Sequence, residues 1–419
     1  MTDDAWRFRR REWLMERGCR QQGCLFLSQT SEWFHSQPDD FVPGVRYIVP
    51  EGTKYRITSV KPLDDKIGTR GQRMRSIAGF LLKSRADDES EMPIVPDAQY
   101  VPLYEGRMVH QFDHAAKAYV TGEGRGAIWR DLDLNSKAII PHFYTILDYG
   151  PLPLRAGFCR VTGQTNERTL LASAVPIGLP AGDTVSIAEI EPSIDAAKLV
   201  WVCLANSFLI DFFLRQKIST TMNFFFLATV PFVQPQQDSP EYRQLAALAT
   251  QLVSITPEIK LAEPAQDPVR RAGIRAEVDT IVAKLYNLST IEFAYILTTF
   301  PLLDRDQPPL PDDLFVRWNK QGKPKFEPRS YVTRDTALLA YFRHRGIAPP
   351  EDLAIWYRDE VKVNMIDDEF CPFRMGPIRN LEQRVTEYSR LGAIAYIPSK
   401  GKKWDPNGPF QPRTQEVIA

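Results

Sequence analysis

Two proline-containing breaks divide the chain into stretches that carry different hydrophobic patterns. The first, DDESEMPIVPDAQ at residues 87–99, is acidic, and the second, DRDQPPLPDD at residues 304–313, is rich in proline. Proline and clustered polar residues end helices and strands, so such breaks are typical of boundaries between packed units. The 419 residues have room for two to four domains at roughly 100–200 residues each. With a further change of pattern near residue 239, the breaks predict four regions: residues 1–90, 91–238, 239–303 and 304–419.

Strands are predicted where apolar and polar residues alternate with a period of two. The clearest cases are VRYIVP (45–50), KYRITSV (54–60), GFCRV (157–161) and TLLASAVP (169–176). The aromatic run at residues 224–230, which Pro231 ends, reads as a buried strand whose phenylalanines belong to the core.

Helices are predicted where apolar residues recur every three or four positions. Residues 194–216 fit one helix, and a second begins with Ser239 as N-cap and Pro240 in the first turn. Further helices are expected at residues 272–287, 335–345, 350–359 and 381–391, with a basic hairpin, SKGKKW, at residues 399–404. Strands in the first half and helices in the second predict an α+β fold. The helical segment would brace a central core, and a small C-terminal module would follow.

Composition favours a cytoplasmic protein without membrane contact. Hydrophobic residues make up 43% and charged residues 25%, and no apolar run reaches the ~18–20 residues of a membrane helix. The N-terminal sequence MTDDAWRFRRREW has no apolar stretch of the secretory kind. Five scattered cysteines argue against a disulfide framework.

The charge distribution is uneven although the totals balance at 52 basic and 52 acidic residues. Residues 41–75 contain eight basic side chains against three acidic ones. Such a stretch is either an ordinary solvated face or a surface that attracts phosphates. Under the second interpretation, Arg73 and Arg75 contact the DNA backbone.

The chain shows no catalytic motif of a DNA methyltransferase. Enzymes that methylate exocyclic amines hold the flipped base with a polar-Pro-Pro-aromatic loop. The pairs Pro308-Pro309 and Pro349-Pro350 lack the aromatic residue and the preceding Asn or Asp. The glycine-rich TGEGRG at residues 121–126 lacks the strand–loop–helix context of a cofactor loop, so it is predicted to be a turn.

Metal chemistry has little support in the sequence. His110 and His114 have the spacing of two zinc ligands on a helix, but no third ligand is near, and a structural role is predicted. Glu351, Glu360 and Lys362 loosely resemble a nuclease motif. Metal-dependent cleavage needs clustered carboxylates, whereas Glu351 and Glu360 are expected at opposite ends of one helix.

Three segments, taken in order, carry a resemblance to a known family. They are VPLYEGRMVHQFDH (101–114), RVTGQTNERTLLASAVP (160–176) followed by residues 199–232, and RAEVDTIVAKLYNLSTIEFAYILTTFP (275–301). They resemble the C-terminal, target-recognition half of the adenine-specific DNA methylases of bacterial type IIG restriction–modification systems. The related methylases of phage-defence systems such as BREX and DISARM share this likeness. It spans roughly residues 20–300, and the catalytic half of the family is missing.

The resemblance implies a DNA-recognition component that acts on double-stranded DNA with a separate catalytic methyltransferase polypeptide. S-adenosylmethionine would bind to that partner, and other defence-system subunits are possible partners. Arg reads guanine, and Asn or Gln reads adenine, whereas loop residues at a helix end clamp phosphates. The DNA-binding candidates are Arg73, Arg75, Arg107, His110, Gln111, Gln164, Asn166, Arg168, Lys217 and Asn223.

Two alternatives stay open at this point. Asn166, Glu167 and Arg168 could instead brace the fold through a buried network. The chain as a whole could be a structural adaptor in a defence complex that reads no bases, or a nuclease whose site lies in residues 304–419. A recognition module needs a basic face, whereas an adaptor needs an apolar or mixed patch.

Overall fold

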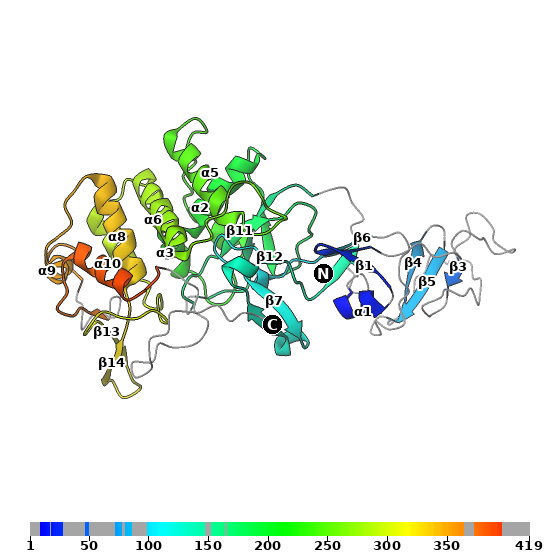
Figure 1. Cartoon of the computed structure of the whole chain (residues 1–419), viewed down its shortest axis with the longest axis horizontal. Coiled ribbons are helices and arrows are strands. Elements are labelled where there is room, and N and C mark those ends of the chain that lie inside the picture. Colours follow the sequence, from blue (N-terminus) through cyan, green and yellow to red (C-terminus); the bar gives the residue numbers. More distant parts are fainter. Residues whose placement is uncertain are drawn as a thin grey trace.

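The computed structural model describes residues 9–16, 18–27, 99–146, 152–163, 166–363 and 373–395, together with three strands within residues 47–85. Strands lie mostly in the first half of the chain and helices mostly in the second, and the strand pairs are mainly antiparallel, which confirms the expected α+β class (Figure 1). Residues 54–60 and the predicted hairpin at 399–404 lie outside the described residues.

The strands form five small sheets rather than one large one within the described ranges. The four-stranded sheet has the order β1(Arg20–Gln22), β2(Leu25–Leu27), β6(Gln99–Pro102), β9(Tyr144–Ile146), and the two-stranded sheet pairs β7(Lys117–Thr121) with β8(Ile128–Asp131). Two three-stranded sheets have the orders β11(Ala172–Val175), β10(Arg155–Cys159), β12(Val185–Ala188) and β14(Pro324–Pro328), β13(Leu314–Trp318), β15(Phe373–Arg374). The third three-stranded sheet has the order β3(Tyr47–Val49), β5(Phe80–Arg85), β4(Gln72–Ile77). β10 and β11 confirm the strands predicted at 157–161 and 169–176, and β3 lies within 45–50.

The helices fall mostly in the second half of the chain. They are α1(Arg11–Glu16), α2(Asp195–Asn206), α3(Phe208–Arg215), α4(Phe224–Leu227), α5(Pro240–Val253), α6(Pro268–Leu285), α7(Thr290–Thr298), α8(Val332–Arg345), α9(Leu353–Asp359) and α10(Leu381–Arg390). Ser239 caps α5 and Pro240 occupies its first turn, as the sequence predicts. α8, α9 and α10 confirm the three C-terminal helices.

Separate buried hydrophobic clusters lie in the strand-containing region and among the C-terminal helices, and Tyr286, just after α6, packs against three of them. α2 packs on β10 and β11 and also against α5. α6 contacts both α5 and α8, so it lies between the two parts of the molecule (Figure 1). A second buried cluster combines side chains of α3, α7, α8 and α9. α6 therefore acts as the helical brace between the sheet of β10–β12 and residues beyond 304.

The single helix predicted over residues 194–216 is wrong, because α2 and α3 are separate helices that meet at a 59° bend. Ser207 lies at the break in an extended conformation, and its hydroxyl accepts a hydrogen bond from the Ile210 amide. Serine competes with the helix for backbone groups, so it favours a cap over a helix interior. Among the described residues, no single helix is long and apolar enough to cross a membrane.

The buried strand predicted at residues 224–230 is also wrong. The segment forms the short helix α4, because the Asn223 side chain accepts a hydrogen bond from the Phe226 amide and caps the turn. Phe224 and Phe225 are 51% and 75% exposed, so two of the three phenylalanines lie on the surface rather than in the core.

Candidate nucleic-acid interface

Arg168 lies in a buried network between β11 and the start of α3, and only 3% of its surface is exposed. Its Nε donates to Asp211 Oδ2 at 2.6 Å, and its Nη2 donates to the Asn206 carbonyl oxygen at 2.6 Å. The guanidinium lies 4.1 Å from the centre of the Phe208 ring. A base edge needs an accessible guanidinium. The geometry therefore supports the bracing role of Arg168 and corrects its assignment as a base-reading residue.

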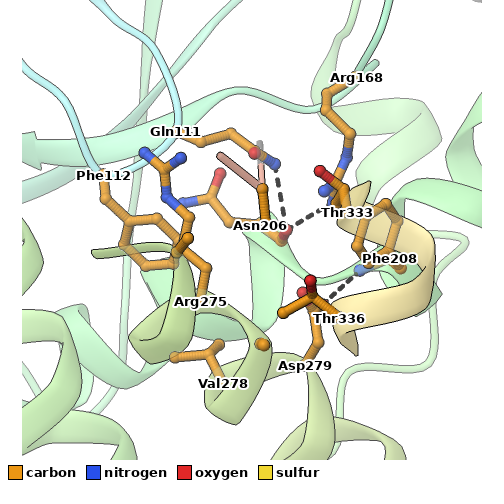
Figure 2. Close-up of a pocket in the computed structure, with 13 residues that line it drawn as sticks. Gln111, Phe112, Arg168, Asn206, Phe208, Arg275, Val278, Asp279, Thr333 and Thr336 are labelled. Atoms are coloured by element: carbon orange, nitrogen blue, oxygen red, sulfur yellow. Dashed lines mark hydrogen bonds between the residues drawn. The ribbon is translucent and has the colours of Figure 1, made fainter. Parts of the chain in front are cut away.

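Asn206, the last residue of α2, connects three parts of this network. Its side chain pairs with the backbone of Ala172 in β11, donating to the carbonyl at 2.8 Å and accepting from the amide at 3.0 Å. Its own carbonyl oxygen accepts from Gln111 Nε2 at 3.1 Å as well as from Arg168 (Figure 2). Gln111 is 1% exposed, so it too stabilises the fold and does not reach DNA.

The cavity beside this network is lined by residues of α6, including Arg275 and Asp279, and has a volume of about 20 Å³ (Figure 2). This volume holds about one water molecule and excludes a base or a cofactor. Asp279 accepts a hydrogen bond from the Phe208 amide at 2.8 Å, and burial raises the pKa of its carboxyl to about 6. Asp279 thus ties α6 to the start of α3.

The two histidines of the H-x-x-x-H pattern lie in an irregular segment, not on a helix. His114 is fully buried, and its Nε2 hydrogen-bonds Thr256 Oγ1 at 2.8 Å. Burial lowers the pKa of His114 to about 4 and that of His110 to about 3, so both rings are neutral near pH 7. Across the described parts of the chain, no cluster of three His, Cys, Asp or Glu residues could hold a metal ion. His110 is therefore not placed to contact phosphate as a cation.

An exposed surface forms where two segments far apart in the sequence pair through their backbones. The Met222 amide donates to the Arg160 carbonyl at 2.8 Å, and the Thr162 amide donates to the Thr220 carbonyl at 3.3 Å. Arg215, at the end of α3, donates to the carbonyl of Asn166 at 2.7 Å. We call the exposed and half-buried side chains of residues 160–163, 166–167 and 215–226 the loop surface; Thr162, Arg215, Ile218 and Met222 within these segments are buried.

Three of the predicted DNA-binding residues belong to the loop surface. Asn166 and Lys217 are exposed, and Asn223 is half-buried because it caps α4. Val161 (63% exposed) and Phe225 (75% exposed) add exposed apolar side chains on the same segments. The structure thus brings together Asn166 with Lys217 and Asn223, which are some fifty positions away along the chain.

The loop surface carries both signs of charge. Arg160 Nη1 forms an exposed ion pair with Asp183 Oδ1 at 2.8 Å. Lys217 Nζ donates to the hydroxyl of Thr229 at 2.8 Å, which holds the ammonium group at the edge of the surface. Glu167 adds a half-buried acid. The surface is therefore mixed and polar, with exposed aromatics, rather than strongly basic.

The remaining predicted residues are dispersed. Arg73 and Arg75 lie in β4, opposite Ser84 and Leu82 of β5. Arg107 is exposed, and its Nη1 donates to the Ala127 carbonyl at 2.9 Å, beside the turn that joins β7 and β8. The segment TGEGRG forms that turn, as predicted. Gln164 lies outside the described residues.

The chain was compared with protein families, with curated proteins and with solved structures. None of the three comparisons finds a match.

Sequence reasoning missed the aromatic part of the loop surface. A run of three phenylalanines followed by Leu227 reads as core by composition, and burial is the usual fate of such residues. The signal that distinguishes the segment is Asn223, since Asn before an apolar run is a helix N-cap as well as a polar loop residue. Once a single turn of helix is fixed, its residues cannot all face the core.

Proposed function

We propose that this chain is the DNA target-recognition component of a modification methylase, acting with a separate catalytic polypeptide that binds S-adenosylmethionine. The observation that supports it best is the loop surface. Asn166, Lys217 and Phe225 are all exposed there, on segments that hydrogen-bond to each other.

The residue types of the loop surface suit a nucleic-acid contact. Asn166 offers the paired donor and acceptor that read adenine, and Lys217 can neutralise a phosphate. Ser219 and Thr220 add exposed hydroxyls that bond either bases or phosphates. An exposed phenylalanine such as Phe225 contacts bases by stacking or by wedging between them.

The buried network beneath the loop surface supports the same proposal. Binding residues work best when rigid elements hold them. Arg215 fixes the carbonyls of Asn166 and Glu167 at 2.7 and 2.8 Å, and Arg168 ties the same segment to α3. The arginines thus position the polar segment, while its exposed neighbours make the contacts.

A structural adaptor is the second candidate, because the loop surface is mixed in charge and Val161 and Phe225 are its most exposed apolar residues. Such a patch also suits a protein partner. The nuclease alternative is not proposed: Glu360 lies at the C-terminal end of α9, and Asp352 rather than Glu351 caps its start, so Glu351 and Glu360 flank the helix at opposite ends. Among the residues of this region that the structure describes, no group of three His, Cys, Asp or Glu side chains could hold a metal ion.

The test compares duplex DNA binding by the full chain and by the double variant Lys217→Gln/Phe225→Ser. Fluorescence anisotropy with a labelled pool of random duplexes is measured at several salt concentrations. The control is Lys260→Gln/Leu261→Ser, which removes an exposed lysine and its exposed apolar neighbour from the loop after α5.

We expect the loop variant to bind at least tenfold more weakly than the control, with a salt slope smaller by about one. Equal binding by the two variants would contradict DNA recognition through the loop surface and would favour the adaptor.

A further inference from the structure

The β13–β14 hairpin is the most continuous stretch of exposed chain within the described residues that has regular structure. Nine consecutive residues, from Trp318 to Phe326, are exposed, whereas Val316, two positions before Trp318, is 1% exposed. Figure 1 shows the hairpin extending from the body of the C-terminal region. The hairpin is not among the strands that the sequence pattern predicts.

The hairpin is basic and carries aromatic residues. Its four basic side chains are Arg317, Lys320, Lys323 and Lys325, and its one acid is Glu327. Glu327 pairs with Lys325 at 3.0 Å and lies 3.6 Å from Arg317. Among the described residues, no acid pairs with the two lysines of the turn, so the positive charge is concentrated at the tip.

The strand register separates the side chains onto two faces. Val316 is opposite Phe326, and Trp318 is opposite Pro324, so these four residues share one face. Trp318 and Phe326 are 47% and 45% exposed there. The ribbon therefore has an aromatic face that ends at a basic tip.

The tip is held in one conformation by its own turn. Asn319 Oδ1 accepts from the amides of Gln321 and Lys323 at 2.9 and 2.8 Å. Gly322 has a φ of +70°, which a residue with a Cβ adopts only with strain. The base is fixed as well, because β13 also pairs with β15. Lys320 and Lys323 are thus presented on a preorganised support.

We infer that the β13–β14 hairpin is a second DNA-binding element, inserted into the groove of duplex DNA with Lys320 and Lys323 against the phosphates. A two-stranded ribbon fits the major groove, which is about 12 Å wide and 8.5 Å deep. From buried Val316 to Asn319 the ribbon extends about 10 Å at 3.4 Å per residue, enough to reach the groove floor. The aromatic face supplies apolar contacts to sugars and thymine methyl groups.

The experiment measures binding of a labelled 24-base-pair duplex to the full chain and to Lys320→Gln/Lys323→Gln as a function of salt. Lys260→Gln/Lys362→Gln is the matched control, because it removes two exposed lysines elsewhere. We expect the hairpin variant to lower the slope of log K against log salt by about two, and the control to change it little. Melting temperatures of all three proteins should agree, since the changed lysines are exposed.

Equal slopes for the hairpin variant and the control would overturn the inference, as would the absence of duplex binding by the unchanged chain. Single strands of the same length that bind as tightly, with the same dependence on Lys320 and Lys323, would also overturn the assignment to a duplex groove. If an acidic polypeptide displaces the labelled duplex but unlabelled duplex does not, the hairpin would instead bind a protein partner, and the inference would be overturned. The inference is tested separately from the loop surface. The two double variants change different residues, and the DNA binding of each is compared with that of its own control.

Discussion

Arg168→Ala is expected to unfold the strand-containing core more easily without acting on a DNA contact. The substitution leaves the Asp211 carboxylate buried, and among the described residues the Thr169 amide, at 3.0 Å, is then the group that donates to it. Breaking a buried ion pair from one side costs about 3–5 kcal/mol. At about 2–4 °C per kcal/mol for a unit of this size, the melting temperature should fall by about 6–20 °C.

The assay is thermal and urea unfolding of the purified chain, followed by circular dichroism. Arg160→Ala serves as the control, because Arg160 forms an exposed ion pair with Asp183, for which a loss below about 1 kcal/mol is expected. Arg168→Lys should fall between the two, since it keeps the charge beside Asp211 but not the forked geometry. If Arg168→Ala melts like Arg160→Ala while its preference among duplexes changes, the bracing role is refuted.

Three further predictions follow from other buried or exposed groups. Burial raises the pKa of the Asp279 carboxyl from 3.8 to about 6, so the folded chain favours the protonated carboxyl. The stability that this protonation contributes is present below pH 4 and is lost as the pH rises through 6. Measured by urea unfolding, the stability of Asp279→Asn relative to the unchanged chain should therefore increase by up to about 3 kcal/mol between pH 4 and pH 7. Arg384→Met should destabilise the C-terminal helices by about 3–5 kcal/mol, because Asp313 loses its buried ion pair at 2.5 Å and Asp335 keeps Arg334 but loses Arg384 at 2.7 Å; hydrogen exchange in α10 measures this. Phe225→Ser should leave the melting temperature unchanged within about 2 °C, since the ring is 75% exposed.

The sequence predicted elements well where a local signal and a hydrophobic pattern agreed. Ser239 followed by Pro240 marks the start of α5, and the alternation at 169–176 marks β11. The pattern failed at Ser207, where apolar residues continue with helical spacing across a break. Periodicity records which face is buried, but it does not record a bend that keeps both helices buried.

The site was only partly predictable, for a different physical reason. Arg168 and Lys217 are both cations in polar segments, and composition does not tell which one meets a buried acid. Asp211, the partner of Arg168, lies 43 positions further along the chain, so the pairing depends on tertiary structure. Val161 and Thr221 likewise become neighbours only through a backbone bridge between distant segments.

Photochemical cross-linking of the full chain to DNA tests the central claim most directly. Duplexes with randomised sequence and 5-iodouracil in place of thymine are bound, irradiated, and digested, and the cross-linked peptides are identified by mass spectrometry. Aromatic side chains in contact with bases react preferentially, so the account predicts cross-links in residues 217–226, centred on Phe224 and Phe225. Cross-links confined to other surfaces, with none in residues 160–167 or 217–226, would contradict it.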